Sequence, residues 1–274
     1  MTYATLMVHL QPGQPNGSVL EVTRRLAQRH ASSVVGIAAV QPMQLYGDGL
    51  SSADVYQMNL HEITQEVHNA ENEFRQALEG SVADLEWRSA SVFSSSADHI
   101  AREARSADLI LTGIDGTNFL DIVRRVNTGD LVMRAGRPVL LVPASIDGLK
   151  LERVMIAWKE SRETRRAIVD VMPLLRHASH VSLVEVWPPD ELAASGARLA
   201  QVAGWLKRHD IPVECLSSPS AADDATSLYA IGADRGIDLT VAGAYGHSRA
   251  REWALGGVTR DLLMSVNRCS LVSH

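Results

Sequence analysis

The sequence is poor in the residues that build disulfide-stapled or metal-centred domains. Only two of its 274 residues are cysteine, Cys215 and Cys269, and neither lies in a Cys-x-x-Cys or Cys/His cluster. A disulfide framework and a zinc site are therefore not expected, and a reducing cytosol is the natural compartment. We interpret both cysteines as small buried hydrophobic residues, and we expect no metal held by protein ligands.

Positive charge and long hydrophobic runs are also lacking. The formal net charge is −6, which argues against a broad binding surface for nucleic acid. No stretch approaches the roughly 20 apolar residues needed to cross a bilayer. The opening residues MTYATLMVHL carry no basic cluster of the kind that begins a secretory signal. We expect a soluble cytoplasmic protein with no membrane or nucleic-acid partner.

Aromatic residues make up only 5% of the chain, whereas hydrophobic residues make up 46%. The apolar content is therefore mainly aliphatic, which is typical of buried parallel strands. Short aliphatic runs alternate with longer helical patterns, as in βαβ units around a parallel sheet. The clearest helical stripe consists of Ile63, Val67, Ala70, Phe74 and Leu78, spaced by three and four residues.

The alternation predicts ten strands and eight helices. The expected strands are 5–9, 33–38, 85–90, 108–113 and 138–143, then 153–158, 180–186, 212–216, 238–243 and 270–274. The expected helices are 18–30, 53–79, 96–106 and 129–135, then 163–176, 190–207, 222–234 and 259–266. Pro173 falls inside one of these helices and is expected to kink it or end it early.

The two halves repeat one another. Asp108, Gly113 and Gly116 recur 130 residues later in the segment IDLTVAGAYG, and Thr128 recurs 131 residues later as Thr259. A repeat of this length predicts two domains of one fold. We place them at residues 1–144 and 152–274, with SIDGLKL around residues 145–151 as the linker.

Glycines punctuate the segment that follows the fourth strand of the second copy. Gly243, Gly246, Gly256 and Gly257 precede Thr259, which opens the next expected helix. Glycines let backbone N–H groups approach a ligand closely, and a helix N-terminus favours phosphate. Thr259 can cap that helix and also donate a hydrogen bond to a phosphate oxygen. The segment therefore predicts a phosphate loop at the carboxyl edge of the sheet.

The pattern G-x2-G-x9-G, followed by a Val-Thr pair and a helix, resembles the ATP-binding loop of the universal stress protein family. The resemblance covers nearly the whole chain as a tandem pair. It implies an α/β fold of two repeated open parallel five-stranded sheets, order 3-2-1-4-5, with helices on both faces, packed as a pseudo-dimer through the closing strands PVLLVP and CSLVSH. It also implies base contacts from Ala157, Lys159, Val186, Ala242 and Gly243, and phosphate or ribose contacts from Gly246, Gly256, Gly257 and Val258.

Three further residues have two interpretations each. His247 is either a phosphate ligand or a solvated loop residue. Trp158 either stacks on a base or simply packs at its strand end. Thr259 is either a helix cap alone or also a phosphate ligand.

The chain departs from the family pattern in three places. Lys159 stands where ATP-binding members have an aspartate, so a hydrogen-bond donor replaces an acceptor. Gly257 replaces a serine or threonine hydroxyl. In the first copy, Arg125 and Val126 stand where the second copy has Gly256 and Gly257, so we expect no nucleotide there.

No nucleophile and base stand in a recognisable arrangement, so catalysis is not predicted. The leading hypothesis is a nucleotide-responsive stress or regulatory protein with ATP, or a related nucleotide, in the second domain only. The first alternative is a protein-interaction platform without nucleotide. The second is a slow ATPase or another small-molecule enzyme. The tandem pair forms either the whole assembly or half of a homodimer.

Overall fold

The computed structural model describes residues 2–42, 50–93, 95–114, 126–187, 192–219, 224–244 and 267–274. The chain divides into two compact units. The N-terminal unit comprises residues 3–137 and 142–148, and the C-terminal unit comprises residues 1–2, 138–141 and 149–274. Each unit therefore holds most of one sequence repeat.

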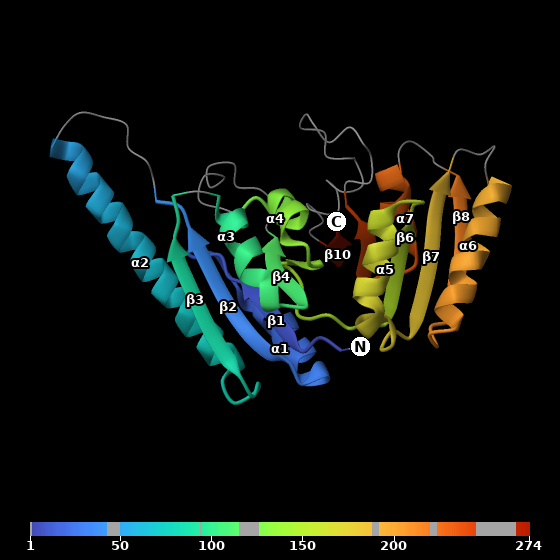
Figure 1. Cartoon of the computed structure of the whole chain (residues 1–274), viewed down its shortest axis with the longest axis horizontal. Helices are drawn as coiled ribbons and strands as arrows, with labels where there is room; N and C mark the ends of the chain where they lie inside the picture. The colour runs from blue at the N-terminus through green and yellow to red at the C-terminus, as the bar shows by residue number, and fades with distance from the viewer. Residues whose placement is uncertain are drawn as a thin grey trace. The chain divides into compact units, whose positions relative to one another are not determined.

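Strands and helices alternate through the first half of the chain (Figure 1). In order they are β1 (Thr5–His9), α1 (Gly17–His30), β2 (Ser33–Val40), α2 (Leu50–Leu78), β3 (Leu85–Ser91), α3 (Ser96–Glu103), a 3₁₀ turn (Ala104–Ser106), β4 (Leu109–Ile114), α4 (Thr128–Ala135) and β5 (Val139–Pro143). The strand order is β3-β2-β1-β4-β5, and the β1–β2, β2–β3 and β1–β4 pairs are parallel.

The second half repeats this plan. Its elements are β6 (Arg153–Trp158), α5 (Arg162–Leu175), β7 (His180–Trp187), α6 (Leu192–Lys207), β8 (Glu214–Pro219), α7 (Asp224–Asp234), β9 (Leu239–Gly243) and β10 (Cys269–Ser273). The strand order is β8-β7-β6-β9-β10, and all four pairs are parallel. Within the C-terminal unit, residues 139–141 also pair antiparallel with β10. The predicted α/β fold and strand order are thus confirmed, and packing as a pseudo-dimer stays a prediction.

The same aspartate clamp begins the first strand of each half. Asp108 Oδ2 accepts hydrogen bonds from the backbone N–H groups of Ala4 and Thr5, at 2.7 and 3.0 Å. Asp238 Oδ2 accepts from Glu152 and Arg153, at 2.7 and 3.2 Å. The carboxylate satisfies two donors at the start of a buried strand, which explains why this aspartate occurs in both repeats.

The apolar stripe of α2 packs against β2 and β3. Ile63, Phe74 and Leu78 are at most 2% exposed. Phe74 also meets the ring of Trp87 on β3, with centroids 5.5 Å apart. A Cβ on Gly36 of β2 would lie 2.6 Å from Trp87 and 2.9 Å from Phe74. The missing side chain therefore lets both rings approach the sheet.

Three local predictions meet different outcomes. Cys269 is buried as expected, but Cys215 is exposed, because it lies on the edge strand β8. The strand expected at 212–216 begins only at Glu214, because Pro212 has no N–H to donate to a ladder. Pro173 does not end α5 at once: the helix continues to Leu175.

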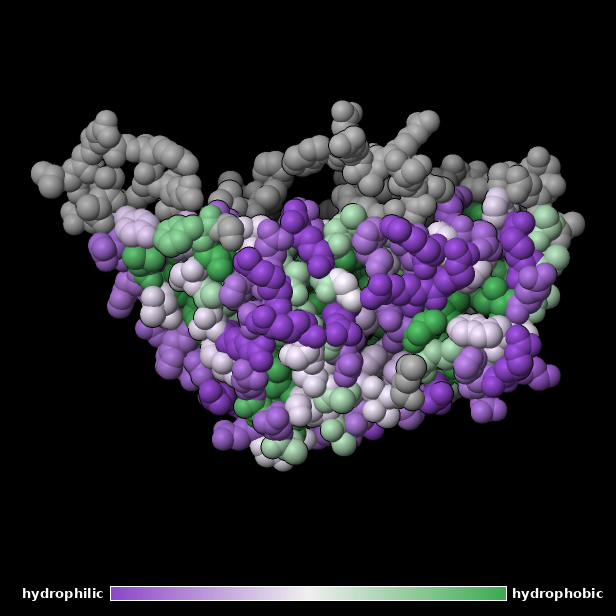
Figure 2. All heavy atoms as spheres, viewed as in Figure 1, coloured by the Kyte–Doolittle hydropathy of each residue, from purple (hydrophilic) through white to green (hydrophobic). Residues whose placement is uncertain are grey.

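Hydrophilic residues predominate on the described surface seen in Figure 2, and hydrophobic ones form small groups. Among the described residues, the large hydrophobic side chains that are exposed are Met58, Phe93, Val169 and Tyr229. None of the described helices is long and apolar enough to cross a membrane.

Candidate functional site

Three of the residues predicted to contact a base lie together in the C-terminal unit. Ala157 pairs in register with Ala242 on β9 and with Val184 on β7. These three are buried in one apolar cluster with Leu228 of α7, and Val186 packs against the cluster. The sheet face toward α7 therefore carries small apolar side chains near its carboxyl edge.

An ion pair lies at the same edge. Lys159 directly follows β6, and its Nζ lies 3.8 Å from Oδ2 of Asp224, in the first turn of α7. The side chains are 52% and 43% exposed, so both remain open to solvent. Lys159 offers only donors, and an ionised Asp224 offers only acceptors. The pair thus presents both hydrogen-bonding functions beside the apolar cluster.

Gly243 ends β9 in close contact with the first turn of α5. Ser161 caps α5 by accepting a hydrogen bond from the Thr164 N–H, at 3.2 Å. A Cβ on Gly243 would lie 2.4 Å from Thr164 N and 2.6 Å from the carbonyl carbon of Glu163. Only glycine fits this contact, and it brings the end of β9 against a helix N-terminus.

That first helical turn already holds a negative charge. Glu163 is 4% exposed and pairs with Arg162. Burial opposes ionisation, but hydrogen bonds from Arg162, the Glu163 backbone and Ser161 hold the pKa of Glu163 below its usual value. A carboxylate at a helix N-terminus offsets the partial positive charge there. An anionic ligand at this edge would therefore depend on other N–H groups than those of α5.

The N-terminal unit has larger polar side chains at the corresponding positions. His9 pairs in register with Thr112, as Ala157 does with Ala242. His9 Nδ1 lies 2.9 Å from Thr112 Oγ1, and both residues are at most 2% exposed. Burial lowers the pKa of His9 to about 4. A neutral, hydrogen-bonded imidazole therefore fills this edge of the first sheet.

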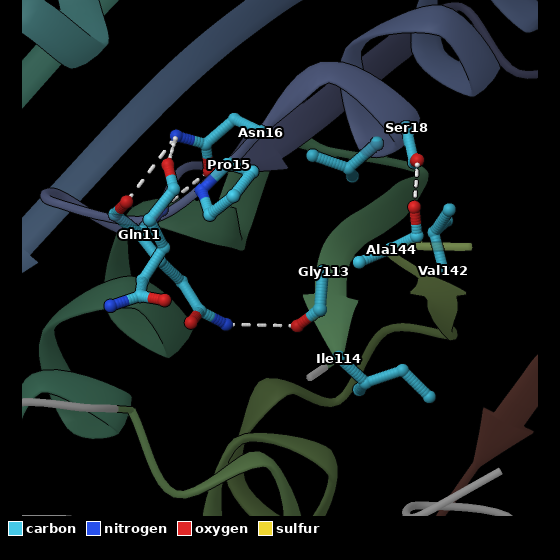
Figure 3. A pocket seen from close by; sticks show the side chains of 10 residues that line it. Gln11, Pro15, Asn16, Ser18, Gly113, Ile114, Val142 and Ala144 are labelled. Atoms are coloured by element: carbon cyan, nitrogen blue, oxygen red, sulfur yellow. Dashed lines mark hydrogen bonds between the residues drawn. The ribbon is translucent and has the colours of Figure 1, made fainter. Parts of the chain in front are cut away.

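A small cavity lies between the β1–α1 connection and the ends of β4 and β5 (Figure 3). Gln11 Nε2 donates to the Gly113 carbonyl, and Ser18 Oγ donates to the Ala144 carbonyl, each at 2.8 Å. Asn16 Oδ1 accepts from the Gln11 N–H at 2.9 Å. The cavity volume of about 10 Å³ is the room of roughly one water molecule, so a nucleotide does not fit it as it stands.

The other predicted contacts fall on parts of the chain outside the described residues. They are Gly246, His247, Gly256, Gly257, Val258 and Thr259. Gly116 and Arg125 of the first copy also lie outside, whereas Val126 is described and buried. Within the described ranges, no three His, Cys, Asp or Glu side chains gather as a metal-binding group.

The sequence analysis missed a buried polar network between β7, α6 and β8. Glu185, only 1% exposed, accepts a hydrogen bond from Ser195 Oγ at 2.6 Å, and Ser217 Oγ donates to Ser195 at the same distance. Arg198 Nε lies 3.6 Å from Glu185 Oε1, and its guanidinium stacks over Trp187. A glutamate inside the apolar run VSLVEVW was the available signal.

Trp158, on β6 beside Glu185, is 7% exposed, which agrees with the packing interpretation. Its buried indole Nε1 has no hydrogen-bond partner in the described structure. Because that side chain is enclosed, stacking on a base would require it to move.

No family model matches the chain, and no curated protein matches it. Solved structures match it over its full length. A universal stress protein from Archaeoglobus fulgidus DSM 4304 is 13% identical, with a TM-score of 0.75 and 98% of each chain covered. A structure from Pseudomonas aeruginosa UCBPP-PA14, also described as a universal stress protein, is 14% identical, with a TM-score of 0.63, covering 99% of this chain and 93% of that one. The chain thus has the fold of a tandem universal stress protein.

Proposed function

We propose that the chain is a tandem member of the universal stress protein family and acts as a regulatory protein that binds a nucleotide in its C-terminal unit only. The full-length likeness to universal stress protein structures supports the family. The proposed base contacts are Ala157, Lys159, Val186, Ala242 and Gly243. The proposed phosphate and ribose contacts are Gly246, His247, Gly256, Gly257, Val258 and Thr259, with ATP as the reference ligand.

The contrast between the two sheet edges carries this proposal. In the C-terminal unit, Ala157 and Ala242 leave the edge free of bulky side chains. In the N-terminal unit, the buried pair of His9 and Thr112 fills the same positions. A purine needs an apolar surface with a few well-placed polar groups, which matches the first edge and not the second.

The phosphates would be held by backbone N–H groups of the glycine-rich segment that follows β9. The contact between Gly243 and α5 fixes where that segment starts. Because Glu163 already occupies the first turn of α5, the N–H groups near Gly246, Gly256 and Gly257 would hold the phosphates instead.

The test is a calorimetric titration of the full chain with ATP and GTP. In Gly246→Asp, a side chain and a negative charge enter the proposed cradle, so affinity should fall at least about tenfold, or ~1.4 kcal/mol. The matched control is Gly116→Asp, the same change 130 residues earlier in the first copy, which should leave affinity unchanged. Binding that ignores Gly246→Asp would contradict the proposed site.

A protein-interaction platform is the competing function, and the filled edge of the N-terminal unit favours it for that unit. Undetectable binding of both nucleotides to the wild-type chain would extend the platform function to the whole protein. Nucleotide consumption in a steady-state hydrolysis assay would instead favour the enzyme alternative.

A further inference from the structure

We infer that the Lys159–Asp224 pair makes the C-terminal site selective for guanine over adenine. The inference rests on the proposed function, because it concerns the base bound at that same edge. Lys159 Nζ and Asp224 Oδ2 lie 3.8 Å apart, and each side chain keeps about half of its surface exposed. A ligand can therefore reach both groups without breaking into the core.

The two side chains offer a fixed combination of hydrogen-bonding functions. The ammonium of Lys159 donates three hydrogen bonds and accepts none, and the carboxylate of Asp224 only accepts. Asp224 stands in the first turn of α7, where a negative charge is favoured by the helix dipole. The two charges also balance each other, so both groups stay ionised beside a neutral base.

Guanine matches this combination better than adenine. Its O6 is an acceptor for Lys159, and its neighbouring N1–H and N2–H groups can donate together to the two oxygens of Asp224. Adenine can offer one acceptor and only one of its amino hydrogens along the same edge. Guanine therefore makes one more charge-assisted hydrogen bond, which is among the stronger kinds in proteins.

The apolar cluster would support the rest of the base. Ala157 and Ala242 are small, and Val186 packs at the edge of the same cluster. Small side chains let the flat purine ring lie over the ends of β6 and β9, and the polar edge then meets Lys159 and Asp224. At the corresponding strand end of the N-terminal unit, Gln11 donates instead to the Gly113 carbonyl.

The experiment is a calorimetric titration of the full chain with four nucleotides. GTP should bind at least about tenfold tighter than ATP, a difference of ~1.4 kcal/mol. Inosine triphosphate should bind between the two, because inosine lacks the 2-amino group. Lys159→Met, which removes the donor to O6, should weaken GTP binding about tenfold. Lys207→Met removes an exposed lysine at the far end of α6 and is the control expected to change nothing.

Asp224→Asn gives a positive test of the same geometry. The amide can accept from N1–H but donates where the 2-amino group also donates, so GTP binding should weaken. Xanthosine triphosphate carries an oxygen at that position, so its binding to Asp224→Asn should exceed that of GTP. Circular dichroism would confirm that each variant is folded.

The outcomes separate this inference from the proposed function. ATP binding as tight as GTP binding, or Asp224→Asn without a gain for xanthosine triphosphate, overturns the guanine selectivity and leaves nucleotide binding standing. Failure of the wild-type chain to bind any of the four nucleotides overturns both.

Discussion

The two units share a frame but differ at the sheet edge where a ligand would bind. Both begin their first strand with the aspartate clamp of Asp108 or Asp238. At the other end of that strand, the N-terminal unit buries His9 against Thr112, whereas the C-terminal unit has alanines. The frame is therefore kept in both copies, and the edge is free to diverge because few frame interactions depend on it.

The largest expected effect concerns the glycine that closes the fourth strand of each copy. In Gly243→Ala the new Cβ would meet backbone atoms of Thr164 and Glu163 at 2.4 and 2.6 Å, so α5 must shift. We expect a loss of about 3 kcal/mol in the free energy of unfolding, the upper range for overpacking. Urea denaturation gives the loss, and hydrogen exchange in β9 locates it.

The matched variant is Gly113→Ala. A Cβ there meets no described atom within 4 Å, so stability should change by less than about 0.5 kcal/mol. Equal losses in the two variants would contradict the difference in packing that the structure assigns to the two strands.

The next effect is a pH dependence confined to the N-terminal unit. The unfolded chain protonates His9 near its ordinary pKa of 6.5, but burial in the folded unit lowers that pKa to about 4. The free energy of unfolding should therefore fall as the pH drops from 6.5 toward 4, by about 2.5 kcal/mol at a pH of about 4.5. Hydrogen exchange of β1 at several pH values measures this loss.

His9→Gln sharpens that measurement, because glutamine can hydrogen-bond Thr112 without titrating. The variant should lose less stability than the wild type over the same pH range. A wild-type His9 whose pKa in the folded protein, followed by NMR, stays near 6.5 would show that burial does not exclude the proton.

Periodicity and repetition in the sequence were enough to predict the strand order of both halves. Alternating aliphatic runs carry that information because buried parallel strands need it at every position. The helical stripe from Ile63 to Leu78 was visible for the same reason. Edge features were harder to predict: Cys215 was expected to be buried, but β8 is an edge strand, and edge position depends on tertiary topology.

The base edge of the candidate site was partly predictable. Ala157, Val186 and Ala242 come together as the resemblance implied. The partnership of Lys159 with Asp224 was not foreseen, because the two residues are far apart in sequence and only the start of α7 brings them together. The network around Glu185 was missed for a similar reason, since its serine and arginine partners come from two other elements.

The central claim is that nucleotide binds in the C-terminal unit and not in the N-terminal unit. Native mass spectrometry of the full chain, incubated with ATP or GTP, tests it most directly by counting bound nucleotides. The account predicts one nucleotide per chain in the wild type and in Gly116→Asp, and none in Gly246→Asp. Two nucleotides per chain, or one that persists in Gly246→Asp, would contradict it.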